Sequence, residues 1–133
     1  MSLESAVQFT DPYDGKVLSK LLDTSVSFNW TFSGDFDSVT WGLKSRDTND
    51  VNVTLASFSK AGAASISGIP SSYVGRVSGE WNNKTSPGEA TFTLTSIGLE
   101  DAALYAVRIT PSDISDDAID FVELVVKGKL LHI

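Results

Sequence analysis

The sequence predicts an all-β sandwich built around one hydrophobic core. Short runs of alternating apolar and polar residues are separated by clusters of Gly, Pro, Asn, Asp and Ser, a pattern typical of half-buried strands joined by turns. No stretch of ten or more residues shows the period of an amphipathic helix. With 133 residues, the chain has room for a single core.

Five predicted strands lie in the N-terminal half, and they cover 7–9, 17–22, 25–30, 38–44 and 51–58. The first two form one edge, interrupted by the turn residues 11–15. Alternation puts Trp30 on the inward face of the third strand. After a break at 34–37, it does the same for Trp41 in the fourth strand. The polar turn 46–50 then makes the fourth and fifth strands a hairpin.

Four further strands lie in the C-terminal half, and they cover 75–81, 90–95, 103–110 and 118–126. The small, Gly- and Ser-rich segment 61–72 predicts one short edge strand and a loop, which gives nine or ten strands in all. The last two strands form a hairpin around an acidic loop. No repeat or shift in composition marks a boundary, so we expect one domain over 1–127, with 128–133 as a linker stub or strand extension.

The charge of the chain disfavours two classes of partner. Ten Lys and Arg against 17 Asp and Glu give a formal net charge of −7. Nucleic acids and anionic membrane surfaces both attract basic faces, so neither is expected as a partner. No apolar run is long enough to suggest insertion into a membrane. The N-terminus lacks the pattern of a signal peptide, so we interpret the chain as a fragment without its leader, stalk or anchor.

The chain contains no cysteine, which excludes disulfides, cysteine-bound zinc and thiol catalysis. Three Asn-x-Ser/Thr sequons, at Asn29, Asn52 and Asn83, favour the secretory route and predict glycosylation there. The alternative is that polar loops match the pattern by coincidence. The location that we expect is the extracellular side of the plasma membrane, within a larger single-pass receptor.

The most specific motif runs from Asp101 to Val107, Asp-Ala-Ala-Leu-Tyr-Ala-Val. It resembles the Asp-x-Ala-x-Tyr-x-Cys signature of V-set immunoglobulin domains, with Val107 in place of the cysteine. The resemblance covers nearly the whole chain and implies a V-type sandwich without the usual disulfide. It implies that Tyr105 forms the tyrosine corner and that Trp41 is the core tryptophan of strand C. It also implies an ion pair between Arg76 and Asp101.

The departures from the V-set pattern concern the missing disulfide. The strand B pattern Val26-x-Phe28-x-Trp30 places Trp30 where the first cysteine is expected. We therefore expect Trp30 and Val107 to meet in the core and to fill the volume of the absent cystine. Cross-linking a loop of this size contributes roughly 4–5 kcal/mol in the chain-entropy model, and burying the tryptophan offsets part of that loss. Asp23 replaces a glycine that is usual before strand B.

Cysteine-poor, glycosylated V-like domains resemble the membrane-distal domains of cnidarian allorecognition receptors. This resemblance implies homophilic binding to another copy of the protein on an opposed cell. We expect the contact on the G-F-C-C′ sheet face, which is formed by the predicted strands 118–126, 103–110, 38–44 and 51–58. An enzyme is not expected, because His132 is the only histidine and lies in the terminal stub. No cofactor, metal or catalytic residue is predicted.

The acidic loop 111–120, between the last two predicted strands, occupies the place of the F–G loop. Asp113, Asp116 and Asp117 are candidates for contact with a partner. A solvated acidic turn and a calcium site are the other two interpretations, although the carboxylate spacing matches no known calcium loop.

Alternation also places a mixed set of side chains on the outward side of the G-F-C-C′ face. Candidate partner-binding residues on this face are Thr40, Lys44, Arg108, Phe121, Glu123 and Val125. Exposed Phe121 and Val125 would call for a covering partner, whereas a register shifted by one residue would make Phe121 core. A glycan on Asn52 would crowd part of the face unless it lies at the strand's end.

Two other functions remain open. One is a structural spacer in an extracellular array, which predicts a well-solvated face. The other is a heterophilic or carbohydrate-binding V-type domain, in which exposed Trp81 or Tyr73 would line a groove.

Overall fold

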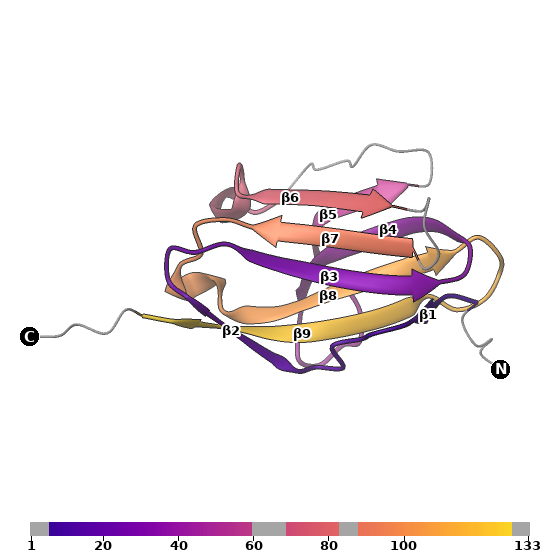
Figure 1. Cartoon of the computed structure of the whole chain (residues 1–133), viewed down its shortest axis with the longest axis horizontal. Helices are drawn as coiled ribbons and strands as arrows, with labels where there is room; N and C mark the ends of the chain where they lie inside the picture. The colour runs from indigo at the N-terminus through magenta and orange to yellow at the C-terminus, as the bar shows by residue number, and fades with distance from the viewer. Residues whose placement is uncertain (1–5, 60–68, 83–87, 129–133) are drawn as a thin grey trace, which may run out of the picture.

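The computed structural model describes residues 6–59, 69–82 and 88–128, and these form an immunoglobulin-like sandwich of two β-sheets (Figure 1). One sheet has the strand order β1-β3-β7-β6. Its strands are β1 (Gln8–Phe9), β3 (Val26–Ser33), β7 (Gly88–Leu94) and β6 (Val77–Asn82). The other sheet has the order β2-β9-β8-β4-β5. Its strands are β2 (Val17–Leu21), β9 (Ala118–Lys127), β8 (Ala103–Pro111), β4 (Phe36–Lys44) and β5 (Val53–Ser59).

All pairings are antiparallel except that of β2 with β9, which is parallel. Two short 3-10 turns, η1 (Ser71–Tyr73) and η2 (Leu99–Asp101), precede β6 and β8. The predicted all-β sandwich without a disulfide is therefore confirmed. Most of the segment 61–72, where a short edge strand was expected, lies outside the described residues, and η1 occupies its end. Of the predicted terminal stub, only Gly128 is described.

The break predicted at 34–37 is shorter in the structure. β3 continues to Ser33 and β4 begins at Phe36, so only two residues join strands that belong to different sheets. Gly34 has a φ of 104°, a conformation that favours glycine. Phe36 is 3% exposed, and burial of its ring explains why the strand starts there and not at Ser38.

The core is unusually rich in aromatic rings that face each other between the sheets. Trp41 stacks against Phe92 and Tyr105, with ring centroids 5.2 and 5.6 Å apart. Phe28 packs against the same Trp41 at 5.6 Å and against Tyr105 at 5.1 Å. Trp30, Trp41, Tyr105 and Val107 are all fully buried.

A buried carboxylate joins the two sheets beside this aromatic cluster. Asp120 on β9 is 3% exposed and points inward. Its Oδ2 accepts a hydrogen bond of 2.7 Å from Trp30 Nε1 on β3. The main-chain N–H groups of Tyr13 and Asp14 donate to the same carboxylate at 2.7 and 2.9 Å. The segment between β1 and β2 is thus fastened to the core, and one buried carboxylate accepts from all three of these donors.

The expected meeting of Trp30 and Val107 stays a prediction, and a polar contact is added beside it. The side chain across the sandwich that bonds to Trp30 is Asp120, which is the register partner of Val107 on the neighbouring strand. The β3 ring that packs on Trp41 is Phe28, and Phe28 also packs on Tyr105, two residues before Val107. Trp30 lies two residues after Phe28 on the same buried face of β3.

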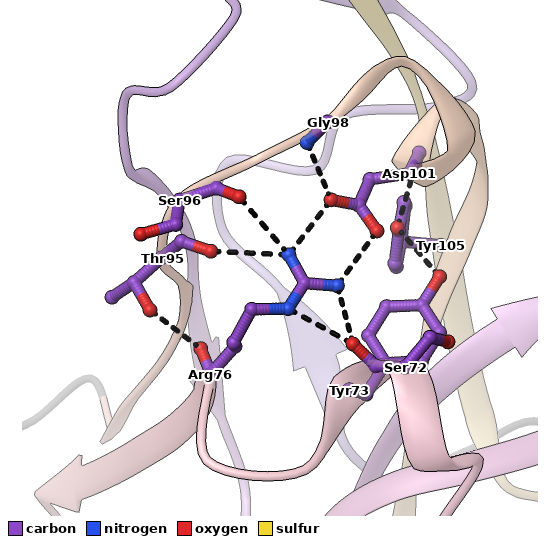
Figure 2. A network of polar contacts seen from close by, with 8 residues as sticks. All are labelled: Ser72, Tyr73, Arg76, Thr95, Ser96, Gly98, Asp101 and Tyr105. Carbon is purple, nitrogen blue, oxygen red and sulfur yellow. Dashed lines mark hydrogen bonds and ion pairs between the residues drawn. The ribbon is translucent and has the colours of Figure 1, made fainter.

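A polar network closes the end of the sandwich where η1 and η2 meet (Figure 2). Arg76 donates from both terminal nitrogens to Asp101, at 2.8 and 2.9 Å, and its Nε and Nη2 donate to the Ser72 carbonyl. The Gly98 N–H donates to Asp101 at 2.8 Å. Tyr105 donates its hydroxyl to the Asp101 carbonyl at 2.6 Å. This bidentate, mostly buried arrangement fixes both turns relative to β8.

Burial and hydrogen bonding act in opposite directions on the groups of this network. Burial alone would raise the pKa of Asp101, but the hydrogen bonds from Arg76 and Gly98 outweigh it and hold that pKa below its ordinary value. The bond to Asp101 raises the pKa of Arg76. Burial raises the pKa of Tyr105 far above its ordinary value. The network is therefore ionised at Arg76 and Asp101 and neutral at Tyr105 near neutral pH.

Candidate functional site: the outward face of the five-stranded sheet

The register of β9 decides which of its side chains face solvent. Ala118, Asp120, Val122 and Leu124 are buried, whereas the alternate residues Ile119, Phe121, Glu123 and Val125 are only partly so. Phe121 pairs with Ala106 and Glu123 with Leu104 on β8. The alternative of a register shifted by one residue is therefore wrong, and Phe121 lies on the outward side of the sheet.

Phe121 is nevertheless only half-exposed, because its own chain covers it. A Cβ placed on Gly15 would lie 2.9 Å from the Phe121 ring, so the segment before β2 lies directly against it. The Lys44 ammonium sits 4.5 Å from the centroid of the same ring. This cation–π contact covers part of the ring. Phe121 is therefore not the most exposed apolar side chain on the outward face of the sheet.

The loop 45–52, between β4 and β5, folds back over the middle of the face. Asp50 accepts an ion-paired hydrogen bond from Arg108 at 2.7 Å, and Arg46 lies 3.6 Å from Glu123. Thr40, the register partner of Arg108, is only 9% exposed. Thr40 was expected at the partner-binding surface. Its burial removes it from the accessible part of the face, although it does point outward.

The most exposed apolar side chains of the sheet lie instead on β2, its edge strand. Val17 is 60% exposed and Leu21 is 54% exposed. They pair with Glu123 and Lys127 of β9, so they continue the outward face past Val125. Sequence reasoning missed them. In β2, apolar residues occur on both faces of the strand, Leu18 on one and Val17 and Leu21 on the other. The sequence of this strand alone therefore does not show which face is inward.

The β8–β9 loop is acidic and exposed. Asp113 accepts hydrogen bonds from the N–H and hydroxyl of Ser115, and these bonds, the hydroxyl first, lower the pKa of Asp113. Asp117 lies 3.9 Å from Arg108 Nε on the outward face, and Asp116 is exposed beside it. Ile114, at the loop tip, is 89% exposed.

Within the described ranges, no group of three or more His, Cys, Asp or Glu is placed to hold a metal ion.

Two of the three sequons can be placed. Asn29 is exposed on the outer side of β3 and donates its side-chain amide to Thr91 at 2.7 Å. Asn52 precedes β5 and accepts hydrogen bonds from Ser45 and Thr48. It therefore sits in the loop at the end of the strand. Asn83 lies outside the described residues.

The aromatic residues considered for carbohydrate binding have different surroundings. Tyr73 is 6% exposed and bonds to Tyr105, so it is not available to a ligand. Trp81 is half-buried, and its ring packs against Phe36 at 5.4 Å. It borders a shallow hollow of about 140 Å³, which is also lined by Glu80, Asn82, Glu89 and Thr91.

His132, the only histidine, falls outside the described residues. The parts of the chain that are described include no helix with the length and apolar character needed to cross a membrane.

No protein-family model and no curated protein sequence matches this chain. Many solved structures share its fold. A chimeric titin Z1Z2 carrying a decorin peptide superposes with a TM-score of 0.62 at 18% identity, over 97% of this chain and 100% of the other. Tim-1 gives 0.62 at 19% identity, over 88% and 96%. A voltage-gated sodium channel β subunit, studied for its multimeric cell-adhesive interactions, gives 0.64 at 13% identity, over 87% and 94%. Similarity at this level of identity shows the immunoglobulin-like fold alone.

Proposed function

We propose that this domain is the extracellular recognition domain of a cell-surface receptor and that it binds another copy of itself on an opposed cell. The observation that carries the proposal is the outward face of the β2-β9-β8-β4-β5 sheet. Exposed Val17 and Leu21 lie there beside charges of both signs. An apolar patch rimmed by mixed charges is the usual character of a protein contact, and mixed charges allow a surface to complement itself.

The similar structures fit this use of the fold. The sodium channel β subunit is described in terms of cell-adhesive interactions, and Tim-1 has the same sandwich. A spacer domain requires no exposed apolar side chains on this face, so Val17 and Leu21 favour recognition. The half-buried Trp81 and the buried Tyr73 give the carbohydrate-binding alternative less support.

Bead aggregation tests the proposal. Beads coated with the wild-type domain should aggregate, because many weak contacts act together on one surface. Val17→Asp should abolish aggregation by placing an unpaired charge in the apolar contact. The matched control is Ser78→Asp on the exposed side of β6, in the opposite sheet, which should aggregate normally. Wild-type beads that stay dispersed, together with a monomer at high micromolar concentration in the ultracentrifuge, would contradict homophilic binding.

A further inference from the structure

The outward side of β9 carries a sequence of side chains that is complementary to itself when reversed. Starting just before the strand, the outward positions are Asp117, Ile119, Phe121, Glu123, Val125 and Lys127. An acid stands at one end and a base at the other. Two apolar residues, Ile119 and Val125, lie at equal distances from the midpoint at Val122. We call these residues, together with Val17 and Leu21 of β2, the β2–β9 stripe.

We propose that the homophilic contact is a two-fold, antiparallel packing of two β2–β9 stripes, one from each copy. The proposal rests on the function proposed above and specifies its geometry. In this arrangement Asp117 faces Lys127 of the second copy, and Ile119 faces Val125 of the second copy. Each of these contacts occurs twice, because a two-fold interface repeats every pair.

The centre of the stripe is complementary as well. Reversal about Val122 brings Glu123 opposite Phe121 of the second copy, and Phe121 carries the Lys44 ammonium 4.5 Å above its ring. A carboxylate therefore approaches a cation. The parallel arrangement would instead place Asp117 against Asp117 and Lys127 against Lys127. Like charges facing each other oppose association, so charge alone selects the antiparallel form.

Neighbouring parts of the same face are less suited to the contact. The loop 45–52 lies over β8, where the Arg108–Asp50 pair holds it, and its Arg46 reaches Glu123 at the near edge of the stripe. The chain's own loop thus occupies that area, while β2 ends the sheet with Val17 and Leu21 exposed. The stripe is about 33 Å long and about 10 Å wide, from the rise of a strand and the spacing of two strands. Such an area gives a weak single contact, which suits recognition by arrays on two membranes.

A charge swap tests the geometry. Lys127→Glu and Asp117→Lys should each weaken self-association by about tenfold or more, because each creates two like-charge contacts in its own dimer. When the two variants are mixed, every such contact becomes attractive, so beads carrying different variants should aggregate with each other and not with themselves. The double variant Lys127→Glu/Asp117→Lys should bind itself again. Sedimentation of the same proteins measures the affinities.

The controls separate the possible failures. Glu80→Lys on β6, in the opposite sheet, makes the same charge change as Asp117→Lys outside the stripe and should leave self-association unchanged. Thermal melting checks that Asp117→Lys remains folded beside Arg108. If the wild type does not self-associate, the proposed function fails. If it does, and the single variants bind as well as the wild type or the mixture shows no rescue, the antiparallel stripe is wrong and the proposed function stands.

Discussion

Trp30 and Asp120 connect the two sheets through a buried hydrogen bond, 2.7 Å from the indole Nε1 to the carboxylate. Trp30 belongs to β3 and Asp120 to β9, so the bond crosses the sandwich close to the place where related domains carry a disulfide. Tyr13 packs edge-on against the indole at 5.4 Å and donates its main-chain N–H to the same carboxylate. A non-covalent link therefore operates beside the missing covalent one.

Replacement of Trp30 by Phe should lower the free energy of unfolding by about 1.5–3 kcal/mol. The ring remains buried, but the hydrogen bond to a charged acceptor is lost. Asp120→Asn should cost less than Asp120→Ala. An amide oxygen can still accept from Trp30 and Tyr13, and only the bond from the Asp14 N–H is lost. Urea denaturation of each variant measures these differences. Equal stability of Trp30→Phe and wild type would show that the bond contributes nothing.

Cysteines at 30 and 107 should form a disulfide, and cysteines at 28 and 107 should not. Trp30 reaches Asp120, the register partner of Val107, whereas Phe28 packs on Tyr105, two residues before Val107. The new cross-link adds roughly 4–5 kcal/mol, whereas the loss of a buried tryptophan removes about 3–5 kcal/mol. Little net change in stability is therefore expected.

Titration of free thiols in denaturant distinguishes the two pairs. The 30/107 variant should show none after air oxidation and two after reduction, whereas the 28/107 variant should show two in both cases. Oxidation of the 28/107 pair alone would show that Trp30 does not occupy the first position of the absent disulfide.

The sequence predicts those parts of the structure that depend on local pattern. Tyr105 and Asp101 belong to one short motif, and their bond spans four residues. Alternation likewise places Trp41 inward and Glu123 outward. In these cases spacing along one strand is sufficient, because a side chain's face follows from its position in the pleat.

Features that depend on distant partners could not be predicted. Asp120 is an inward-facing carboxylate, whereas the alternating pattern of a strand predicts an apolar residue at an inward position. Its donor Trp30 is 90 residues away in sequence. The loop 45–52 is held on the outward face by Arg108 and Asp50, which are 58 residues apart. The exposed β2 residues depend on parallel pairing with the last strand of the chain, which no local pattern indicates.

Asp101 should make stability depend on pH in the acid range. Its folded-state pKa lies below the ordinary value of 3.8, so the unfolded chain binds this proton more readily. The stabilisation is therefore complete above the unfolded pKa and is lost as pH falls through the folded one. Asp101→Asn should be clearly less stable than wild type at pH 7, and the gap should narrow below about pH 4. The midpoints of urea denaturation of both proteins, measured between pH 7 and pH 3, give this stability difference. A gap that stays constant would show that ionisation of Asp101 has no part in the network.

Gly42→Ala should destabilise the domain strongly, by about 3 kcal/mol or more. β4 and β5 shift register between Trp41 and Gly42, and this irregularity brings the β5 backbone very close. A Cβ on Gly42 would lie 1.9 Å from the Val53 carbonyl oxygen, and backbone cannot move aside as a flexible side chain can. Gly128→Ala, where nothing lies within 4 Å, is the matched control and should change stability by less than about 0.5 kcal/mol. Equal melting temperatures for both variants would mean that β5 does not approach β4 in this way. The edge of the outward face opposite β2 would then be more open than the structure shows.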